Sequence, residues 1–529
     1  MGKEEAAGLL LNRQAMASHT FITGSTGTGK SNAVYHLLDE ITKNGQTTFL
    51  VVEPAKGEYK NVFGNCTDVQ VFGTNPRETP LLRMNPFAFP ENIHILEHID
   101  RLVEIFNACW PMYAAMPAVL KDAIERSYQK VGWDLRNSES EKGVFPTFFD
   151  LLDILPGVIE ESHYSKDTQS DYVGALCTRV KSLTNGIYGS VLCAEDALSD
   201  AEMFDQNVIV DLSRVGSMET KSLLMGILVM KLQEYRMCSS GMNSRLRHVT
   251  VLEEAHNLLR KTSAEQSQEG ANLQGKSVEM LANAIAEMRT YGEGFIIADQ
   301  APGLLDMSVI RNTNTKIILR LPDEEDRKLV GKSAALKEAQ IDELSKLPLG
   351  VAAVYQNEWP EAVLCKIEAY PMPENAVYHK PSKMPHEINA EFVFGQLAVG
   401  KELEPLSSSE MEQLKLWLKR HETVLKPEDS RYLERVFAGG ELDVAKTRKA
   451  VFDFFGGIGT VVDYCAAAKK SLTPRKEFLE QLQGQYGLKA AAADWVLNSV
   501  ISMGMSLNPD AKAVDNLRTN FEQQGGRVL

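Results

Sequence analysis

A glycine-rich segment near the start of the chain combines residue types that bind phosphate. The run Gly24-Ser25-Thr26-Gly27-Thr28-Gly29-Lys30-Ser31 follows a short apolar stretch and precedes a helical pattern. This G-x-x-x-x-G-K-S spacing between a strand and a helix is typical of a loop that holds a nucleoside triphosphate. Glycines let backbone N–H groups turn toward the phosphates, and the following helix presents its positive amino-terminal end to the same anion.

The residues of this loop have distinct expected roles. Lys30 is expected to reach the β- and γ-phosphates, and the Ser31 hydroxyl is expected to hold Mg²⁺. The sequence therefore predicts ATP and Mg²⁺ as cofactors. The predicted nucleotide-binding residues are Gly24, Ser25, Thr26, Gly27, Thr28, Gly29, Lys30, Ser31 and Asn32.

Two adjacent carboxylates follow an apolar run much later in the chain. Glu253 and Glu254 come directly after Val249-Thr250-Val251-Leu252, which places both acids at the carboxyl end of a buried strand, where open α/β sheets bind ligands. Glu253 is suited to hold Mg²⁺ through water, and Glu254 is suited to polarise the attacking water. On the residues alone, a second interpretation stays open, in which the pair only begins a helix.

Other polar residues stand near predicted strand ends. Gln300 follows the apolar run at 295–298, and its amide is suited to sense the γ-phosphate or to orient water. Hydrolysis also needs a positive charge on the transition state, often an arginine from a neighbouring subunit. We rank Arg320 first and Arg289 second, ahead of Arg311, although a plain surface salt bridge is an alternative role for each.

These residues need strands and helices that bring them together. Short apolar runs without alternation recur along the chain, as is typical of strands covered on both faces of a parallel sheet. Helical patterns separate them, which indicates βαβ units. The runs lie at 20–23, 48–52, 69–72, 208–212, 249–252, 295–298 and 316–319, with a hairpin at the sheet edge from 351–355 and 362–367.

The pattern changes in two parts of the chain. Strand signals disappear between about 90 and 205, where apolar residues recur at helical spacing, and again after a proline-rich stretch near 371–385. We therefore predict an α/β core with a mostly parallel sheet at 1–375, interrupted by a helical insertion at about 90–205. A linker at 376–407 and a C-terminal helical domain at 408–529 complete the predicted organisation.

Composition narrows the class of protein. The 529 residues carry a formal net charge of −15, which argues against nucleic acid bound over the whole surface but allows a local basic channel. No run of 18 apolar residues occurs, so we expect no membrane span. The seven cysteines are scattered without a C-x-x-C pair, so neither a disulfide framework nor a zinc site is indicated, and a reducing, cytoplasmic setting fits best.

Taken together, these motifs resemble the HerA branch of the HerA–FtsK superfamily of P-loop translocases. The likeness rests on the phosphate loop, Glu53-Pro54-Ala55-Lys56-Gly57-Glu58-Tyr59, Asn85-Pro86, Glu253-Glu254-Ala255-His256 and Gln300. The resemblance implies a RecA-like P-loop NTPase core, a homo-hexameric ring and ATP-driven movement or unwinding of double-stranded DNA. It also implies a nuclease or another effector as a partner, in DNA processing or antiphage defence.

The chain departs from that family at both ends. Family members usually carry an N-terminal β-barrel before the phosphate loop, which starts at residue 24 here, so no barrel fits before it. Either the protein lacks this barrel or the stretch before Met1 was lost. Residues 385–529 match nothing that the resemblance assigns. Between the two catalytic strands, a polar, glycine-containing stretch at 261–277 carries Arg260, Lys261 and Lys276 at or near its ends. It suits a pore or intersubunit loop contacting DNA phosphates, although a solvated loop is the alternative.

Two further functions stay open on the sequence. ATPases of type IV secretion and conjugation share the same core features and act on protein or single-stranded DNA at a membrane. The protein could instead be a nucleotide-gated regulatory subunit of an effector complex, which the unassigned C-terminal region favours. Stimulation of ATP turnover by DNA would distinguish a DNA translocase from a regulatory subunit.

Overall fold

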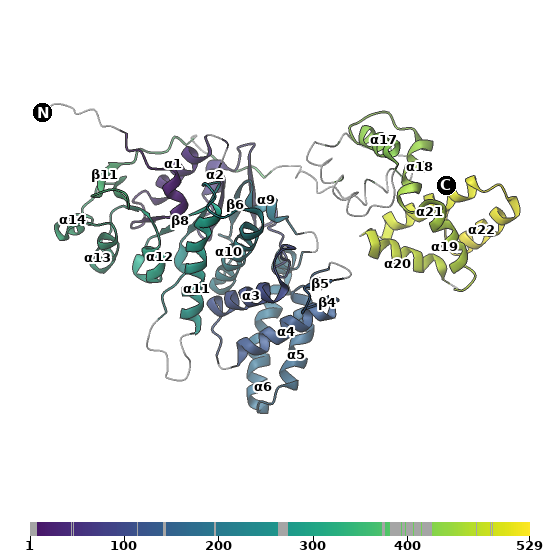
Figure 1. The fold of residues 1–529 in the computed structure, drawn as a ribbon, viewed down its shortest axis with the longest axis horizontal. Coiled ribbons are helices and arrows are strands. Elements are labelled where there is room, and N and C mark those ends of the chain that lie inside the picture. The colour runs from purple at the N-terminus through teal and green to yellow at the C-terminus, as the bar shows by residue number, and fades with distance from the viewer. Residues whose placement is uncertain are drawn as a thin grey trace. The chain divides into compact units, whose positions relative to one another are not determined.

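The chain divides into two units, Met1–Lys380 and Pro381–Leu529, in a computed structural model (Figure 1). Most of the predicted linker at 376–407 lies outside the residues that the structure describes. The described residues are 8–528 except 44, 46, 114, 141–143, 195–196, 263–272, 373–375, 381–392, 394–396, 398–405, 407–413, 415–425, 472, 487 and 489.

The apolar runs of the first unit pair into a nine-stranded sheet with the order β11-β10-β9-β1-β8-β7-β2-β6-β3. The strands from β9 to β3 are parallel, and β10 and β11 form an antiparallel hairpin at one edge. The bounds are β1 Thr20–Thr23, β2 Thr48–Glu53, β3 Val69–Gly73, β6 Asn207–Asp211, β7 His248–Glu253, β8 Glu293–Asp299, β9 Thr315–Ile318, β10 Val351–Gln356 and β11 Val363–Lys366. The α/β fold class and the edge hairpin predicted from the sequence are confirmed.

Both faces of this sheet are covered, which explains the apolar runs without alternation. On β1, Phe21 packs into one apolar cluster and Ile22 into another. Residues of α1 (Lys30–Thr42) and α2 (Tyr59–Phe63) join the cluster of Ile22, and residues of α10 (Met218–Ser239) and α11 (Leu273–Glu287) join that of Phe21. The sheet is therefore the middle layer of three.

A helical insertion connects β3 to β6, as predicted. Its first helix, α3, packs against α10 and α11, so the insertion shares the core on that face of the sheet. A short hairpin of β4 (Trp133–Asp134) and β5 (Glu139–Ser140) interrupts the helices. The helices are α3 Ile95–Cys109, α4 Met116–Lys130, α5 Phe148–Glu161, α6 Lys166–Tyr172, η2 Val173–Cys177, α7 Thr178–Thr184, α8 Gly186–Leu192 and α9 Asp200–Phe204.

Shorter helices complete the first unit between and beyond the strands. The helices next to β7 and β8, namely η3, η4 and η5, are single turns of three or four residues. Their bounds are η1 Gln14–Ser18, η3 Ala255–Asn257, η4 Met288–Tyr291, η5 Pro302–Leu304, α12 Met307–Arg311, α13 Glu324–Ser333 and α14 Glu338–Glu343.

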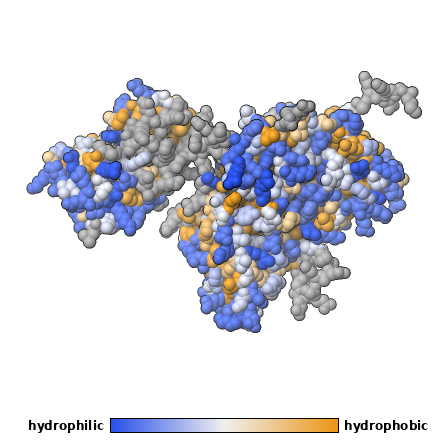
Figure 2. Space-filling model, turned by 180° about the vertical axis from the view of Figure 1, so that it is seen from behind, coloured by the Kyte–Doolittle hydropathy of each residue, from blue (hydrophilic) through white to orange (hydrophobic). Residues whose placement is uncertain are grey.

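The second unit is helical in its described part, as predicted, and has its own apolar core. Its helices are α17 Pro427–Phe437, α18 Val444–Phe454, α19 Gly457–Ala467, α20 Pro474–Tyr486, α21 Ala490–Leu507 and α22 Ala511–Gln523. Across the described residues no single helix has the length and apolarity to cross a bilayer, whereas the pair α18 and α19, bent by 65°, meets that criterion jointly. On the face drawn in Figure 2, hydrophilic residues predominate and apolar ones are interspersed among them.

Register brings the carboxyl ends of three neighbouring strands, β1, β8 and β7, to the same side of the sheet. Thr23, the last residue of β1, pairs with Asp299, the last residue of β8. Glu253, the last residue of β7, pairs with Ala298 of β8. The phosphate loop, the Glu253-Glu254 pair and Gln300 therefore all follow strands that end at the same edge, where α/β proteins bind their ligands.

Candidate nucleotide-binding site

The phosphate loop has a backbone that requires glycine. Gly27 and Gly29 have φ values of 75° and 108°, in the left-handed region that side chains disfavour. A Cβ on Gly24 would lie 2.7 Å from Thr28 Oγ1 and 2.8 Å from the Cβ of Leu319, too close for any side chain. These glycines let the loop turn tightly into α1, whose positive amino-terminal end begins at Lys30.

Lys30 is buried, and its ammonium group bonds the loop from which it comes. Its Nζ donates to the carbonyl oxygen of Gly24 at 2.8 Å and to that of Ser25 at 3.5 Å. Burial lowers the pKa of Lys30, and the negative charges of Glu254 and Glu253 act in the opposite direction. The lysine of the phosphate loop and the carboxylate pair therefore share one electrostatic environment.

Polar side chains connect the loop to the neighbouring strands. The Ser25 N–H donates to the carbonyl oxygen of Arg320, just beyond β9, at 2.9 Å. The Thr26 hydroxyl donates to Gln300 Oε1, just beyond β8, at 2.8 Å. The structure thus brings Gln300 to the phosphate loop, as the proposed contact with a γ-phosphate requires.

Asn32 directs its side chain away from the loop. Its Nδ2 donates to the carbonyl oxygen of Glu368 at 2.8 Å, and its Oδ1 accepts from the N–H of Tyr370 at 2.7 Å. Because the side chain is bonded to the segment at 368–370, the backbone N–H of Asn32 is the group expected to face a phosphate. Ser31, the second residue of α1, lies next to Lys30 where a Mg²⁺ ligand is expected.

Glu253 is buried, with 7% of its surface exposed, and is held by a tyrosine. The hydroxyl of Tyr59 donates to Glu253 Oε1. Tyr59 begins α2, in a loop that Glu53 closes by accepting from the N–H of Glu58 at 2.8 Å and from that of Tyr59 at 3.2 Å. Burial raises the pKa of Glu253 to about 7, which the Tyr59 hydrogen bond partly offsets.

Glu254 is held differently from its neighbour. It follows β7 directly and has a left-handed backbone with φ 44° and ψ 51°, which is unusual for a residue with a side chain. Burial raises the pKa of its carboxyl group. Its Oε2 is shielded from solvent and accepts no hydrogen bond from the described residues. The nearest cationic contact of this oxygen is an ion pair with His256 at 3.5 Å and not a hydrogen bond. The oxygen can therefore accept a hydrogen bond from a ligand or water, which fits a group that engages attacking water.

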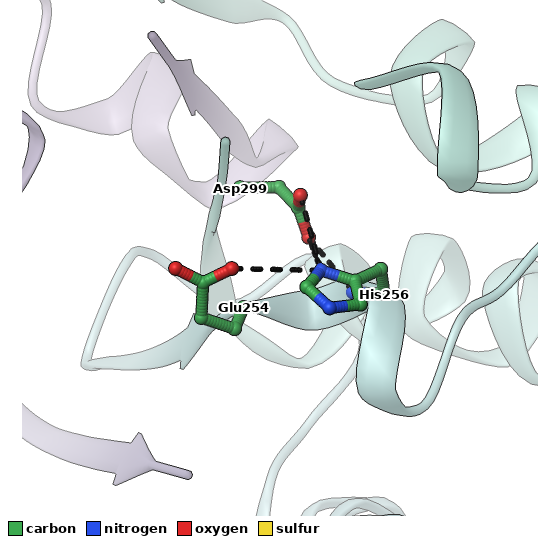
Figure 3. Close-up of side chains that lie close together, drawn as sticks. All are labelled: Glu254, His256 and Asp299. Atoms are coloured by element: carbon green, nitrogen blue, oxygen red, sulfur yellow. Dashed lines mark hydrogen bonds and ion pairs between the residues drawn. The ribbon is translucent and has the colours of Figure 1, made fainter. Parts of the chain in front are cut away.

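Figure 3 shows His256 between the carboxylates of Glu254 and Asp299. The His256 Nδ1 lies 3.0 and 3.2 Å from the Asp299 oxygens and 3.5 Å from Glu254 Oε2. The backbone N–H of His256 also donates to Asp299 Oδ2 at 2.8 Å. The hydrogen bond to Asp299 raises the pKa of His256.

Two sets of side chains in this region carry donor atoms that suit a metal ion. Glu254, His256 and Asp299 offer ligand atoms within 4.8 Å of one another. Their closeness is already explained by hydrogen bonds, because Asp299 accepts from the backbone of His256 and from the Ala301 N–H at 2.9 Å. The Ser31 hydroxyl and the Glu253 carboxylate are hard oxygen donors beside the phosphate loop, and they fit Mg²⁺ better.

The candidate arginines lie in different places. Arg320 is exposed, and its backbone contacts the phosphate loop through Ser25. Arg289 lies in η4, before β8, whereas Gln300 follows the other end of the same strand. Arg311 ends α12 and is also exposed. Arg289 is therefore not brought to the site of its own chain, and a role for any of these arginines in a neighbouring subunit stays a prediction.

Sequence reasoning missed two contacts at this site. Tyr59 belongs to the Glu53–Tyr59 element, whose motif was noted without a role for the tyrosine. No role for Asp299 followed from the sequence, yet it accepts hydrogen bonds from the N–H groups of His256 and Ala301. The position of Asp299 at the tip of a strand was the available signal, since strand tips at this edge face the ligand. The predicted pore stretch at 261–277 lies mostly outside the described residues.

Comparisons with known proteins agree with this geometry. A family model described as "Helicase HerA, central domain" matches residues 3–299. The "Probable helicase MJECL08" of Methanocaldococcus jannaschii is 23% identical over 390 residues, which cover 68% of each chain. The "DNA double-strand break repair helicase HerA" of Sulfolobus acidocaldarius is 26% identical over 370 residues, 67% of this chain and 66% of the relative. The chain thus spans about two-thirds of the length of these relatives.

Solved structures show the same fold at low identity. VirB4 of Thermoanaerobacter pseudethanolicus superposes with a TM-score of 0.52 at 19% identity, covering 67% of this chain and 90% of VirB4. The conjugative coupling protein TrwB superposes with a TM-score of 0.51 at 14% identity, covering 72% of this chain and 92% of TrwB. A complex of TrwB with a non-hydrolysable ATP analogue has a TM-score of 0.50 at 15% identity, covering 70% and 90%. The predicted P-loop NTPase fold is confirmed.

The family match, the phosphate loop and the carboxylate pair fall within one continuous part of the chain. The family model covers more than half of the 529 residues, from before the phosphate loop to the end of β8. The predicted resemblance is confirmed, and the chain belongs to the HerA helicase central-domain family.

Proposed function

We propose that this protein is a Mg²⁺-dependent ATPase that couples ATP hydrolysis to movement along double-stranded DNA. One observation carries the proposal: Lys30 of the phosphate loop and the Glu253-Glu254 pair lie at the same edge of the sheet and influence each other's charge. The relatives named as HerA helicases and the ATP-analogue complex of TrwB support the nucleotide and the DNA as ligands.

The residues of this chain divide the work of hydrolysis among them. The loop N–H groups and Lys30 bind the β- and γ-phosphates, and Ser31 and Glu253 hold Mg²⁺, which neutralises phosphate charge when bound. Glu254 orients the attacking water and takes up its proton, because its raised pKa suits a base and its Oε2 accepts no hydrogen bond from the described residues. Gln300, already in contact with Thr26, reports the γ-phosphate to the loop beyond β8.

The remaining parts of the proposal concern partners. We propose a homo-hexameric ring in which Arg320 of one subunit stabilises the transition state at the next, as arginines do in related NTPases. Duplex DNA is the proposed substrate of movement, and a nuclease or another effector protein is the proposed partner. Local basic residues would supply the phosphate contacts, since the chain as a whole has a formal net charge of −15.

The first test compares ATP turnover with and without duplex DNA for the wild type and two variants. Glu254→Gln keeps the shape of the base but cannot accept a proton, so we expect it to bind ATP normally and to lose about 100-fold or more in kcat. Lys30→Ala is the matched control, because we expect it to lose nucleotide binding itself. Nucleotide binding is measured with a fluorescent ATP analogue at equilibrium.

The outcomes separate the possible functions. Turnover that rises with duplex DNA supports a DNA motor. Turnover that ignores DNA but changes with a partner protein supports a regulatory subunit instead. Normal turnover by Glu254→Gln would contradict the assignment of the base.

A further inference from the structure

Asp299 holds together two loops that carry different catalytic groups. Its Oδ2 accepts from the N–H of His256, two residues after Glu254, at 2.8 Å. Its Oδ1 accepts from the N–H of Ala301, the residue after Gln300, at 2.9 Å. The carboxylate is fully buried, so these bonds are made away from competing water. The loop of the base and the loop of Gln300 are therefore fixed to the same side chain.

His256 carries this connection to the base. Its Nδ1 faces both oxygens of Asp299, at 3.0 and 3.2 Å, and lies 3.5 Å from Glu254 Oε2. Figure 3 shows the imidazole ring with this nitrogen turned toward both carboxylates. Glu254 Oε2 accepts no hydrogen bond from the described residues, and the Nδ1 of His256, 3.5 Å away, forms an ion pair with it.

Other contacts join the same loops farther from the catalytic groups than Asp299 does. The N–H of Asp306 donates to the carbonyl oxygen of Leu259 at 2.9 Å, and the N–H of Lys261 donates to that of Leu304 at 2.7 Å. These backbone bonds join the segments beyond the two catalytic residues. They do not involve Glu254 or Gln300, and the pairing of β7 with β8 ends at Glu253 and Ala298. Beyond that pair, Asp299 is a side chain that joins the two loops next to both groups.

We propose that Asp299 and His256 are positioning residues for ATP hydrolysis, which align Glu254 and Gln300 with each other before nucleotide binds. Asp299 sets the distance between the two loops, and His256 keeps the Glu254 carboxylate in place through its Nδ1 side. Neither residue needs to touch ATP for this role. The inference rests on the proposed ATPase function and adds the groups that hold its base.

The test measures kcat and ATP affinity separately for variants of both residues. In Asp299→Asn one oxygen becomes an NH₂ group, which cannot accept from either backbone N–H. We expect kcat without DNA to fall about 100-fold, because small misplacements of catalytic groups cost that much, while affinity for a non-hydrolysable ATP analogue changes less than about threefold. Asp306→Asn is the matched control, because asparagine also caps a helix and should leave kcat within about twofold.

A series at His256 separates positioning from simple packing. Asparagine places an N–H donor where Nδ1 stands, glutamine places it near Nε2, and alanine removes it. We expect His256→Asn to keep at least about a third of kcat and the other two variants to lose about tenfold or more. His256 lies partly at the surface, so this series decides the matter even where Asp299→Asn does not fold.

Three results would overturn the proposal. One is unchanged kcat in folded Asp299→Asn. Another is equal loss of kcat and ATP affinity, which a general distortion of the site produces. The third is a glutamine variant at His256 that outperforms the asparagine variant. An inactive wild type would instead contradict the proposed ATPase function, so the two failures are distinguishable.

Discussion

Two adjacent glutamates of this site are prepared for different tasks by their surroundings. Glu253 accepts a hydrogen bond from the buried Tyr59, which orients one of its oxygens. Glu254 has a left-handed backbone and an oxygen that accepts no hydrogen bond from the described residues. A carboxylate oriented by a hydrogen bond suits a metal ligand. A carboxylate that has an ion pair with His256 but an oxygen open to a hydrogen bond suits a base that must meet water.

Removing the Tyr59 hydroxyl tests the orientation of Glu253. Tyr59→Phe keeps the ring in its buried place but leaves Glu253 without its donor. We expect the Mg²⁺ concentration for half-maximal ATP turnover to rise about 10- to 100-fold, as is usual when a partner of a metal ligand is lost. A Mg²⁺ titration of ATPase activity measures it.

A second tyrosine provides the control for that experiment. The ring of Tyr35 packs edge-on against Tyr59, with centroids 5.0 Å apart. Tyr35→Phe keeps this contact and removes a hydroxyl that bonds Glu58 and not Glu253, so we expect the same Mg²⁺ dependence as the wild type. Equal shifts in both variants would show that the effect comes from packing of the rings and not from the hydrogen bond to Glu253.

The sequence could predict the groups at this site but not how they hold one another. The phosphate loop and the Glu253-Glu254 pair have local spacing that indicates their chemistry. The contacts of Tyr59 with Glu253 and of Asp299 with His256 join residues that are distant in the chain. Such contacts depend on strand order and register, which residue spacing does not encode.

At the scale of elements, a buried histidine joins β1 to its neighbours. His19 precedes β1 with φ 66°, and its Nδ1 accepts from the N–H of Phe295 in β8 at 3.0 Å. Its Nε2 lies 3.4 Å from the carbonyl oxygen of Ala286 in α11. A neutral ring with its proton on Nε2 satisfies both contacts. The strand that leads into the phosphate loop is thereby fastened to β8 and α11.

This histidine should make the first unit sensitive to acid. Burial lowers the pKa of His19 from 6.5 to about 4. Below pH 6.5 the His19 imidazole is protonated in the unfolded chain but stays neutral in the folded one. The free energy of unfolding therefore falls by about 3 kcal/mol as pH decreases toward 4. Thermal unfolding between pH 7 and pH 4 measures this loss.

The matching variant is His19→Asn, whose oxygen can still accept from the Phe295 N–H without titrating. Because it binds no proton in this range, we expect its stability to fall less steeply over the same pH interval. A variant with the same pH dependence as the wild type would show that other groups cause the acid sensitivity.

Elements were predicted best where burial on both faces left a clear signal. The strands at 20–23, 48–52 and 249–252 appeared as short apolar runs, because helices cover the sheet on either side. The order of those strands was not predictable, since it depends on how helices cross from one face to the other. The small hairpin of β4 and β5 carried no signal, because each of its strands has only two residues.

At the scale of the whole molecule, the proposed ring can be tested by mixing two inactive variants. Lys30→Ala subunits keep Arg320 but bind no nucleotide, whereas Arg320→Ala subunits bind nucleotide but lack the arginine. If Arg320 acts on the neighbouring subunit, co-expression at equal levels restores complete sites at about a quarter of the interfaces. ATP turnover of the purified mixture measures this recovery.

The alternatives give different results in that mixture. An arginine that acts within its own subunit gives no recovery above the single variants. Full activity of Arg320→Ala alone would remove Arg320 from consideration, and Arg289 would then be tested in the same way. Its position at the opposite edge of the sheet allows it to act only on another subunit.

The backbone conformation of Glu254 sets natural selection for abundance against selection for turnover. Glycine and asparagine adopt a left-handed backbone with less strain than glutamate does. Replacing Glu254 by either should therefore relieve local strain and yield more folded protein. In a large library of variants sorted only for cellular level, position 254 should therefore drift toward those two residues. The same library selected for ATP-dependent function should keep glutamate. That result would mark position 254 as one where the protein loses stability in exchange for activity.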